Sequence, residues 1–182
     1  MSHQPVGPYE PLPAVCRPYD PRAPEVARRV SGMIRKRLPG IDVEHVGSTA
    51  VSGCAGKGVV DLIIPYRGGE LSPVLSALKG IGFQRQDSSD PFPEDRPMRV
   101  GSLNHDCDAF RLHVHVVPAN SGEPEEFRLF RDRLRSDPGL LQRYVDEKRR
   151  IIEGGTTDSV EYAQRKGDFV RQALDGTLGV VG

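Results

Sequence analysis

The stretch that decides the fold is residues 45–63, which reads HVGSTAVSGCAGKGVVDLI. A strand ends at the Gly-Ser pair Gly47 and Ser48, and a second strand begins near Val59. A Gly-Ser turn between a strand and a helix start can direct backbone N–H groups and a hydroxyl at a phosphate. An aspartate on the next strand, Asp61, can hold a metal ion against that phosphate. The stretch therefore indicates nucleotide chemistry.

Composition sets the class of protein. The chain has 182 residues, enough for one domain with a real core, and 25 basic residues balance 25 acidic ones. With no net charge and no tryptophan, we do not expect a nucleic acid as its partner. No apolar run approaches the roughly 20 residues of a membrane span, and no signal peptide is expected. The three cysteines form no C-x-x-C pair, so a reduced, cytoplasmic protein is expected.

The pattern along the chain predicts an α+β fold. Residues 1–19 are rich in proline and predict an irregular arm, residues 20–175 a single domain, and residues 176–182 a tail. Asp20-Pro21 is typical of a helix start, and Pro65 to Gly69 should end the second strand. We expect helices at 21–38, 72–78, from 124 onward and at 159–174, strands at 41–46, 59–64, 82–86, 98–103 and 111–117, and a surface loop at 87–97. This order predicts a mixed β-sheet with packed helices and a helical C-terminal third.

Asp61 is the first candidate for chemistry. A carboxylate inside an apolar strand costs several kcal/mol unless it is paired, metal-bound or exposed at a strand end. It is either a metal ligand or general base, or a structural residue that caps a neighbouring loop. The period of two places Ile63 on the same face, where a second acid would complete a pair of ligands for a divalent ion. Ser48 has a similar alternative, since serine is also an ordinary helix N-cap.

Histidines form the second candidate. On the strand 111–117, Arg111, His113 and His115 share one face, and apolar side chains form the other. Two histidines at i and i+2 can ligate one metal or face phosphates as cations, although such pairs also occur on exposed sheets without a catalytic role. The role of His45, directly before the turn, stays open.

Arginines form the third candidate. Arg128, Arg131 and Arg135 line one side of the first C-terminal helix. They are either an anion clamp or a solvated face with Glu125 and Asp132 as partners. The run from Lys148 to Arg150 indicates a solvated helix end.

Several separated motifs together resemble the GrpB family. The resemblance spans about residues 12–175 and rests on the following residues: the run 44–53 (EHVGSTAVSG), Lys57, Asp61-Leu62, the run 113–116 (HVHV), the run 130–135 (FRDRLR), Asp137-Pro138, Tyr144 with Lys148, and Tyr162 with Lys166. It implies a nucleotidyltransferase-like fold of the polymerase-β-like superfamily. Members of the family occur alone or fused to dephospho-CoA kinase, and the family usually has proline where Ser52 and Gly58 stand.

The resemblance also exposes a departure from active nucleotidyltransferases. Those enzymes place two acids one residue apart on a strand and a third acid on a later strand. Here Asp61 matches the first, Ile63 replaces the second, and His113 or His115 stands near the place of the third. Two-metal phosphoryl transfer needs several anionic ligands, and Mg²⁺ prefers oxygen, whereas Mn²⁺ or Zn²⁺ accepts histidine.

Two functions follow as expectations. The first is metal-dependent nucleotidyl transfer to an unknown acceptor, with Asp61, Ser48 and His115 catalytic and Asp61, His113 and His115 holding Mg²⁺, Mn²⁺ or Zn²⁺. The expected phosphate-binding residues are Gly47, Ser48, Thr49, Lys57, Arg131 and Arg135. The alternative is a non-catalytic module that binds a nucleotide or a CoA-like phosphate ligand and is linked to coenzyme A metabolism.

Overall fold

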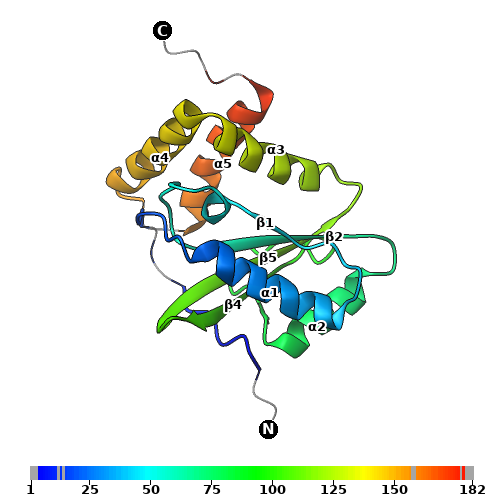
Figure 1. The fold of residues 1–182 in the computed structure, drawn as a ribbon. Helices are drawn as coiled ribbons and strands as arrows, with labels where there is room; N and C mark the ends of the chain where they lie inside the picture. The colour runs from blue at the N-terminus through cyan, green and yellow to red at the C-terminus, as the bar shows by residue number, and fades with distance from the viewer. Residues whose placement is uncertain (1–3, 12, 14, 157–158, 177, 179–182) are drawn as a thin grey trace.

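The structure is a computed structural model that describes residues 4–11, 13, 15–156, 159–176 and 178. A five-stranded sheet lies at its centre, with helices against it (Figure 1). The elements in chain order are α1 (Ala23–Arg37), β1 (Glu44–Val46), the 3-10 turn η1 (Ser48–Ala50), β2 (Val60–Tyr66), α2 (Leu71–Ile81), β3 (Gln84–Arg85), β4 (Met98–His105), β5 (Asp108–Pro118), α3 (Glu123–Ser136), α4 (Pro138–Glu153) and α5 (Ser159–Asp175). The predicted α+β class with a helical C-terminal third is confirmed.

The sheet is mixed, as the sequence predicts. Its strand order is β1-β2-β5-β4-β3, with β2 and β5 parallel and the other pairs antiparallel. In the register of the two central strands, Asp61 lies opposite His113 and Ile63 lies opposite His115. The parallel pairing therefore brings together candidate residues that are about fifty positions apart in the sequence.

One face of the sheet is covered by α1 and α2 (Figure 1). Its core contains Val60, Leu62 and Ile64 from β2 with Leu112 and Val114 from β5, all buried. Because side chains alternate along a strand, Asp61, His113 and His115 point to the opposite face. The apolar face thus fixes the orientation of the candidate site.

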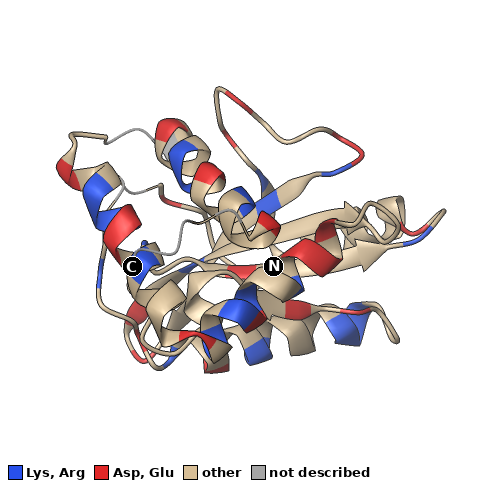
Figure 2. Ribbon diagram, turned by 90° about the horizontal axis from the view of Figure 1, so that it is seen from above, with Lys and Arg blue, Asp and Glu red and all other residues tan. Residues whose placement is uncertain are grey.

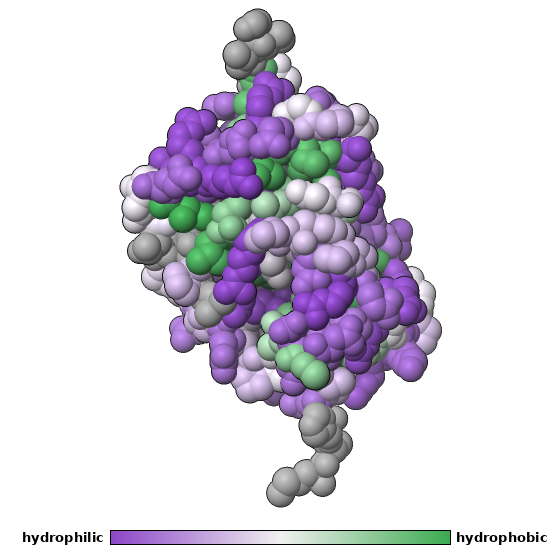
Figure 3. Space-filling view, turned by 60° about the vertical axis from the view of Figure 1, so that its left-hand side comes forward, coloured by the Kyte–Doolittle hydropathy of each residue, from purple (hydrophilic) through white to green (hydrophobic). Residues whose placement is uncertain are grey.

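A second core joins α3, α4 and α5 on the side of β1 (Figure 1). Its buried members include Phe130, Leu134 and Tyr144, and Val51 and Cys54 from the segment after η1. Figure 3 shows apolar side chains gathered on the upper part of the molecule, where these helices lie. Figure 2 shows acidic and basic residues interspersed along the helices, in keeping with the balanced charge.

The described residues among 4–19, called the N-terminal arm, contact the domain at both ends of the segment. Gly7 pairs with Ser102 of β4 and Arg17 pairs with Gly56, both as isolated antiparallel bridges. The Val6 side chain is buried in the first core. The arm therefore has no regular element of its own in its described part, but it is fastened to the domain. Of the predicted tail, residues 177 and 179–182 lie outside the described residues.

Several predicted boundaries are wrong, and Pro65 shows why. It continues β2 opposite Val117 instead of ending it. The Tyr66 carbonyl accepts a hydrogen bond from the backbone N–H of Ala119, next to β5, so the backbone of the preceding Pro65 faces the side of β1. The pairing with β1 ends at Ile63, so the missing N–H of proline breaks no ladder there.

The hairpin between β4 and β5 is also tighter than predicted. Only Asp106 and Cys107 lie between the two strands, and both have positive φ angles, of 49° and 66°. A two-residue turn of this kind matches the twist of the flanking strands, so each strand continues to the turn. Strands β1 and β3 are shorter than expected, and α2 extends beyond 72–78 at both ends.

Within the described part of the chain, no helix has the length and apolar character needed to cross a membrane.

Candidate functional site

The centre of the site is the Asp–His cluster, which consists of Asp61, His113 and His115. The Asp61 Oδ1 atom lies 3.5 Å from Nδ1 of His113 and 3.3 Å from Nε2 of His115. One ligand atom from each residue can be chosen so that all three lie within 4.8 Å of one another. The structure therefore brings together the three residues that the sequence proposes as metal ligands.

Aromatic side chains lie around the cluster, and no sequence pattern predicts them there. The Tyr9 hydroxyl lies 2.9 Å from Nε2 of His113. Phe92, from the loop 87–97, and Phe127, from α3, lie against the ring of His115 at centroid distances of 5.7 and 5.3 Å. Nδ1 of His115 is buried and has no hydrogen-bond partner among the described residues, so the ring is held by its Nε2 contact with Asp61 and by packing.

The electrostatics of the cluster favour a negative Asp61. Burial acts to raise the pKa of the Asp61 carboxyl, but the hydrogen bonds and charges of His113 and His115 outweigh it and hold this pKa well below its usual range. Burial lowers the pKa of His115, and the neighbouring Asp61 opposes this only in part. The cluster thus combines one anionic oxygen donor with an imidazole whose neutral form is favoured.

The donor set fits one metal ion. Ligands placed tetrahedrally at about 2.1 Å from an ion lie about 3.4 Å apart, close to the two distances from Asp61 Oδ1. Two histidines with one carboxylate suit zinc, manganese or iron better than magnesium. Ile63 is fully buried on the same face, so β2 offers no second acid at this position.

The Gly-Ser turn, Gly47 and Ser48, lies directly on the cluster. Gly47 has a φ angle of 72°, and a Cβ atom built on it would lie 2.7 Å from Oδ2 of Asp61. Only glycine allows both this backbone conformation and this close approach. Ser48 begins the 3-10 turn η1 and makes no side-chain capping bond there, so the N-cap alternative does not describe it.

A buried lysine stands on the other side of this turn. A Cβ atom on Gly56 would lie 3.0 Å from the Ser48 hydroxyl oxygen and 3.2 Å from Nζ of Lys148. Lys148 is 1% exposed, donates to the Ala55 carbonyl and lies 3.3 Å from the Cys54 sulfur. Burial lowers its pKa. The prediction that Lys148 belongs to a solvated helix end is therefore wrong, because this part of α4 packs against residues 54–56.

The other residues predicted to bind phosphate have partners elsewhere. The Thr49 hydroxyl donates to the Val59 carbonyl at 3.0 Å and therefore accepts from Nε2 of His45. His45 is mostly buried, which lowers its pKa to about 4. The Lys57 ammonium lies 4.8 Å from the centre of the Tyr162 ring. Thr49 and His45 thus support the turn from within.

The three arginines of α3 contact the turn and the strand before it. Arg128 and Arg131 pair with Glu44 of β1, and Arg131 also donates to the His45 carbonyl. Arg135 donates to the Ala50 carbonyl at 2.8 Å. These contacts tie α3 to β1 and η1, so the arginines support the Gly-Ser turn through their contacts with the protein itself.

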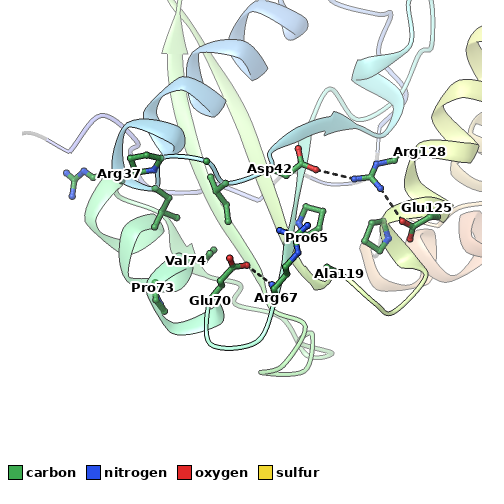
Figure 4. Close-up of a pocket in the computed structure, with 15 residues that line it drawn as sticks. Arg37, Asp42, Pro65, Arg67, Glu70, Pro73, Val74, Ala119, Glu125 and Arg128 are labelled. Carbon is green, nitrogen blue, oxygen red and sulfur yellow. Dashed lines mark hydrogen bonds and ion pairs between the residues drawn. The ribbon is translucent and has the colours of Figure 1, made fainter.

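A pocket of about 590 Å³ lies apart from the cluster (Figure 4). It is lined by the end of α1, the end of β2 and the starts of α2 and α3, and Asp42, Arg128 and Glu125 form ion pairs along its wall. None of the Asp–His cluster residues lines it. Its charges are of both signs, so it indicates no particular ligand.

Comparison with known proteins bears on identity. The family model described as GrpB protein matches residues 13–176. A UPF0157 protein of Pseudomonas aeruginosa is 31% identical in an alignment 169 positions long, which covers 88% of this chain and 66% of that protein. The chain thus spans just under two thirds of that relative. A dephospho-CoA kinase of Mycobacterium tuberculosis matches more distantly, at 28% identity over 158 residues and 39% of its own length.

Solved structures agree on the fold. GrpB from Enterococcus faecalis superposes over 91% of this chain and all of its own, with a TM-score of 0.65 and 19% identity. A Cid1 poly(U) polymerase bound to MgATP covers 70% of this chain and 42% of its own, with a TM-score of 0.50 and 12% identity. The fold therefore occurs in a polymerase, and our expectation that nucleic acid is not a partner is not supported. The chain belongs to the GrpB family and has the fold of the nucleotidyltransferases.

Proposed function

We propose that the protein is a metal-dependent nucleotidyltransferase whose site is the Asp–His cluster together with the Gly-Ser turn. The observation that carries this proposal is the direct contact of the turn with the carboxylate, where a Cβ atom on Gly47 would lie 2.7 Å from Asp61. A metal-ligand set and a turn suited to phosphate thereby meet at one place. The nucleotidyltransferase fold supports the same class of reaction.

In this proposal Asp61, His113 and His115 hold one divalent metal ion. When bound, such an ion would neutralise phosphate charge and polarise a phosphoryl oxygen. The histidines favour Mn²⁺ or Zn²⁺ over Mg²⁺. Phe92 and Phe127 exclude water from one side of His115, which strengthens electrostatic interactions there.

Ser48 and Lys148 are the proposed phosphate contacts. The hydroxyl and the ammonium both border Gly56, which has no side chain to separate them. Lys148 is held in a dry environment by the ring of Tyr144, 4.2 Å from its Nζ. A buried ammonium is costly, and an anionic ligand would offset that cost. In this proposal Lys148 is the lysine that contacts phosphate, in place of Lys57, for which we expected this role from the sequence.

The second candidate function is non-catalytic binding of a nucleotide or a CoA-like phosphate ligand. The buried Ile63 favours it, because a second acid is missing from β2. Such a module would hold phosphate through Ser48 and Lys148 without needing the Asp–His cluster. The two candidates therefore differ in their dependence on metal and on Asp61.

The test measures binding and transfer on the same protein. Thermal stability is recorded with nucleoside triphosphates, CoA, dephospho-CoA and pyrophosphate, each with Mn²⁺, Zn²⁺, Mg²⁺ or a chelator. Transfer is followed with triphosphates labelled at the α-phosphate and an acceptor panel that includes short RNAs. The variants are Asp61→Asn and, as a matched control, Asp146→Asn, whose carboxylate is exposed on α4.

For an enzyme we expect stabilisation by a triphosphate only with metal, label transfer to an acceptor, and loss of both in Asp61→Asn but not in Asp146→Asn. Stabilisation that persists in chelator and in Asp61→Asn would instead establish the binding module. Transfer that continues unchanged in Asp61→Asn would contradict the proposed site.

A further inference from the structure

The N-terminal arm brings a hydroxyl group to the Asp–His cluster. Tyr9 Oη lies 2.9 Å from Nε2 of His113, and the two rings are 5.4 Å apart between centroids. The other nitrogen of this imidazole, Nδ1, lies 3.5 Å from Oδ1 of Asp61. Tyr9, His113 and Asp61 thus form a continuous chain of polar contacts from the arm to the carboxylate.

Contacts on both sides of Tyr9 also hold the arm in this position. The Val6 N–H donates to the Ile81 carbonyl, and Gly7 exchanges two backbone hydrogen bonds with Ser102. The Ser102 hydroxyl donates to the Pro8 carbonyl at 2.7 Å, and Arg111 donates to the Glu10 carbonyl at 2.6 Å. Tyr9 therefore lies between residues that are held by other contacts, and its hydroxyl makes a hydrogen bond with His113.

The hydroxyl is suited to both states of the imidazole. Without metal, the neutral ring places its proton on Nδ1 to donate to Asp61, and Nε2 accepts from the Tyr9 hydroxyl. A metal ion held by Nδ1 would need the lone pair there, so the ring would carry its proton on Nε2 and that N–H would donate to Tyr9 Oη. A hydroxyl can donate in one state and accept in the other.

We infer that Tyr9 is a positioning residue that fixes the tautomer of His113 and so couples docking of the N-terminal arm to metal binding. This inference rests on the metal site of the proposed function. Because coupling between two binding events is reciprocal, metal should tighten the arm as much as the docked arm tightens metal.

The experiment measures metal binding to the full chain by calorimetry, with Mn²⁺ and Zn²⁺ as probes. Tyr9→Phe keeps the ring and removes the hydroxyl, and we expect metal affinity to fall by about 10-fold or more. Tyr19→Phe removes a hydroxyl on the same arm that makes no hydrogen bond to the cluster among the described residues, and it should leave the affinity unchanged. Hydrogen exchange of residues 4–11 should slow on metal binding in the unaltered protein but not in Tyr9→Phe.

A further variant distinguishes loss of the Tyr9 hydroxyl at His113 from a general loosening of the arm. Ser102→Ala removes the hydrogen bond to Pro8 without touching His113, so it should weaken metal binding less than Tyr9→Phe does. Equal losses in the two variants, or no loss in Tyr9→Phe, would overturn the positioning role. Undiminished binding in Asp61→Asn, or no binding by the unaltered protein, would overturn the metal site itself and this inference with it.

Discussion

At the scale of single residues, His45, which lies before the Gly-Ser turn, makes the free energy of unfolding depend on pH. Its Nε2 donates to Thr49, and burial lowers its pKa to about 4 from the usual 6.5. Between these two pH values the unfolded chain binds a proton that the folded protein does not. The free energy of unfolding therefore falls as the pH drops through this range, by up to about 3 kcal/mol.

We predict that His45→Gln reduces this acid-side loss, because glutamine can donate to Thr49 and does not titrate. Urea unfolding of both proteins between about pH 7 and about pH 4.5 measures it. His115, whose pKa is also lowered, contributes in the same direction, so the difference between the two proteins isolates His45. Identical pH profiles for the two proteins would show that His45 is not buried in its neutral form.

At the scale of elements, the Gly-Ser turn depends on glycine in two separate ways. Gly47 and Gly53 have nearly the same φ angle, 72° and 77°, but a Cβ atom on Gly53 would meet nothing within 4 Å. We predict that alanine at either position lowers the free energy of unfolding by about 1–3 kcal/mol through backbone strain. Only Gly47→Ala should also weaken metal binding, because its Cβ displaces Asp61 from the histidines.

Urea unfolding and calorimetric titration with Mn²⁺ on the two variants separate these effects. If Gly53→Ala weakened metal binding as much as Gly47→Ala, the loss would come from strain in the segment and not from contact with Asp61.

Contacts between elements decide which features of the site the sequence can predict. Alternation along β5 places His113 and His115 on the face opposite the apolar residues, and the structure confirms this face. Lys148 and Tyr9 were missed because their positions depend on contacts with residues about 94 and 104 positions away. Pro65 was misjudged because whether a strand tolerates proline depends on where its neighbour ends.

At the scale of the whole molecule, the N-terminal arm docks by fitting a side chain into a gap in the sheet. A Cβ atom on Gly101 would lie 2.3 Å from Cγ1 of Val6, so the valine occupies space that a missing side chain leaves. We predict that Gly101→Ala and Val6→Ala each lower the free energy of unfolding by about 1–3 kcal/mol.

The double variant should lose less than the sum of the two, by about 1 kcal/mol, because the smaller alanine at position 6 makes room for the new methyl group. Urea unfolding of the four proteins gives the coupling. Strict additivity would mean that the side chains at positions 6 and 101 do not interact.

The alternation of β5 also bears on how the sheet assembles. A slip of one residue against β2 and β4 would turn Arg111, His113 and His115 toward α1 and α2, and would turn Leu112 and Val114 away from them. Such a misregistered sheet would bury imidazoles and a guanidinium in an apolar layer and would lose its own core. The polar residues proposed for chemistry therefore also make a one-residue slip of β5 unfavourable and help to specify the register of the sheet.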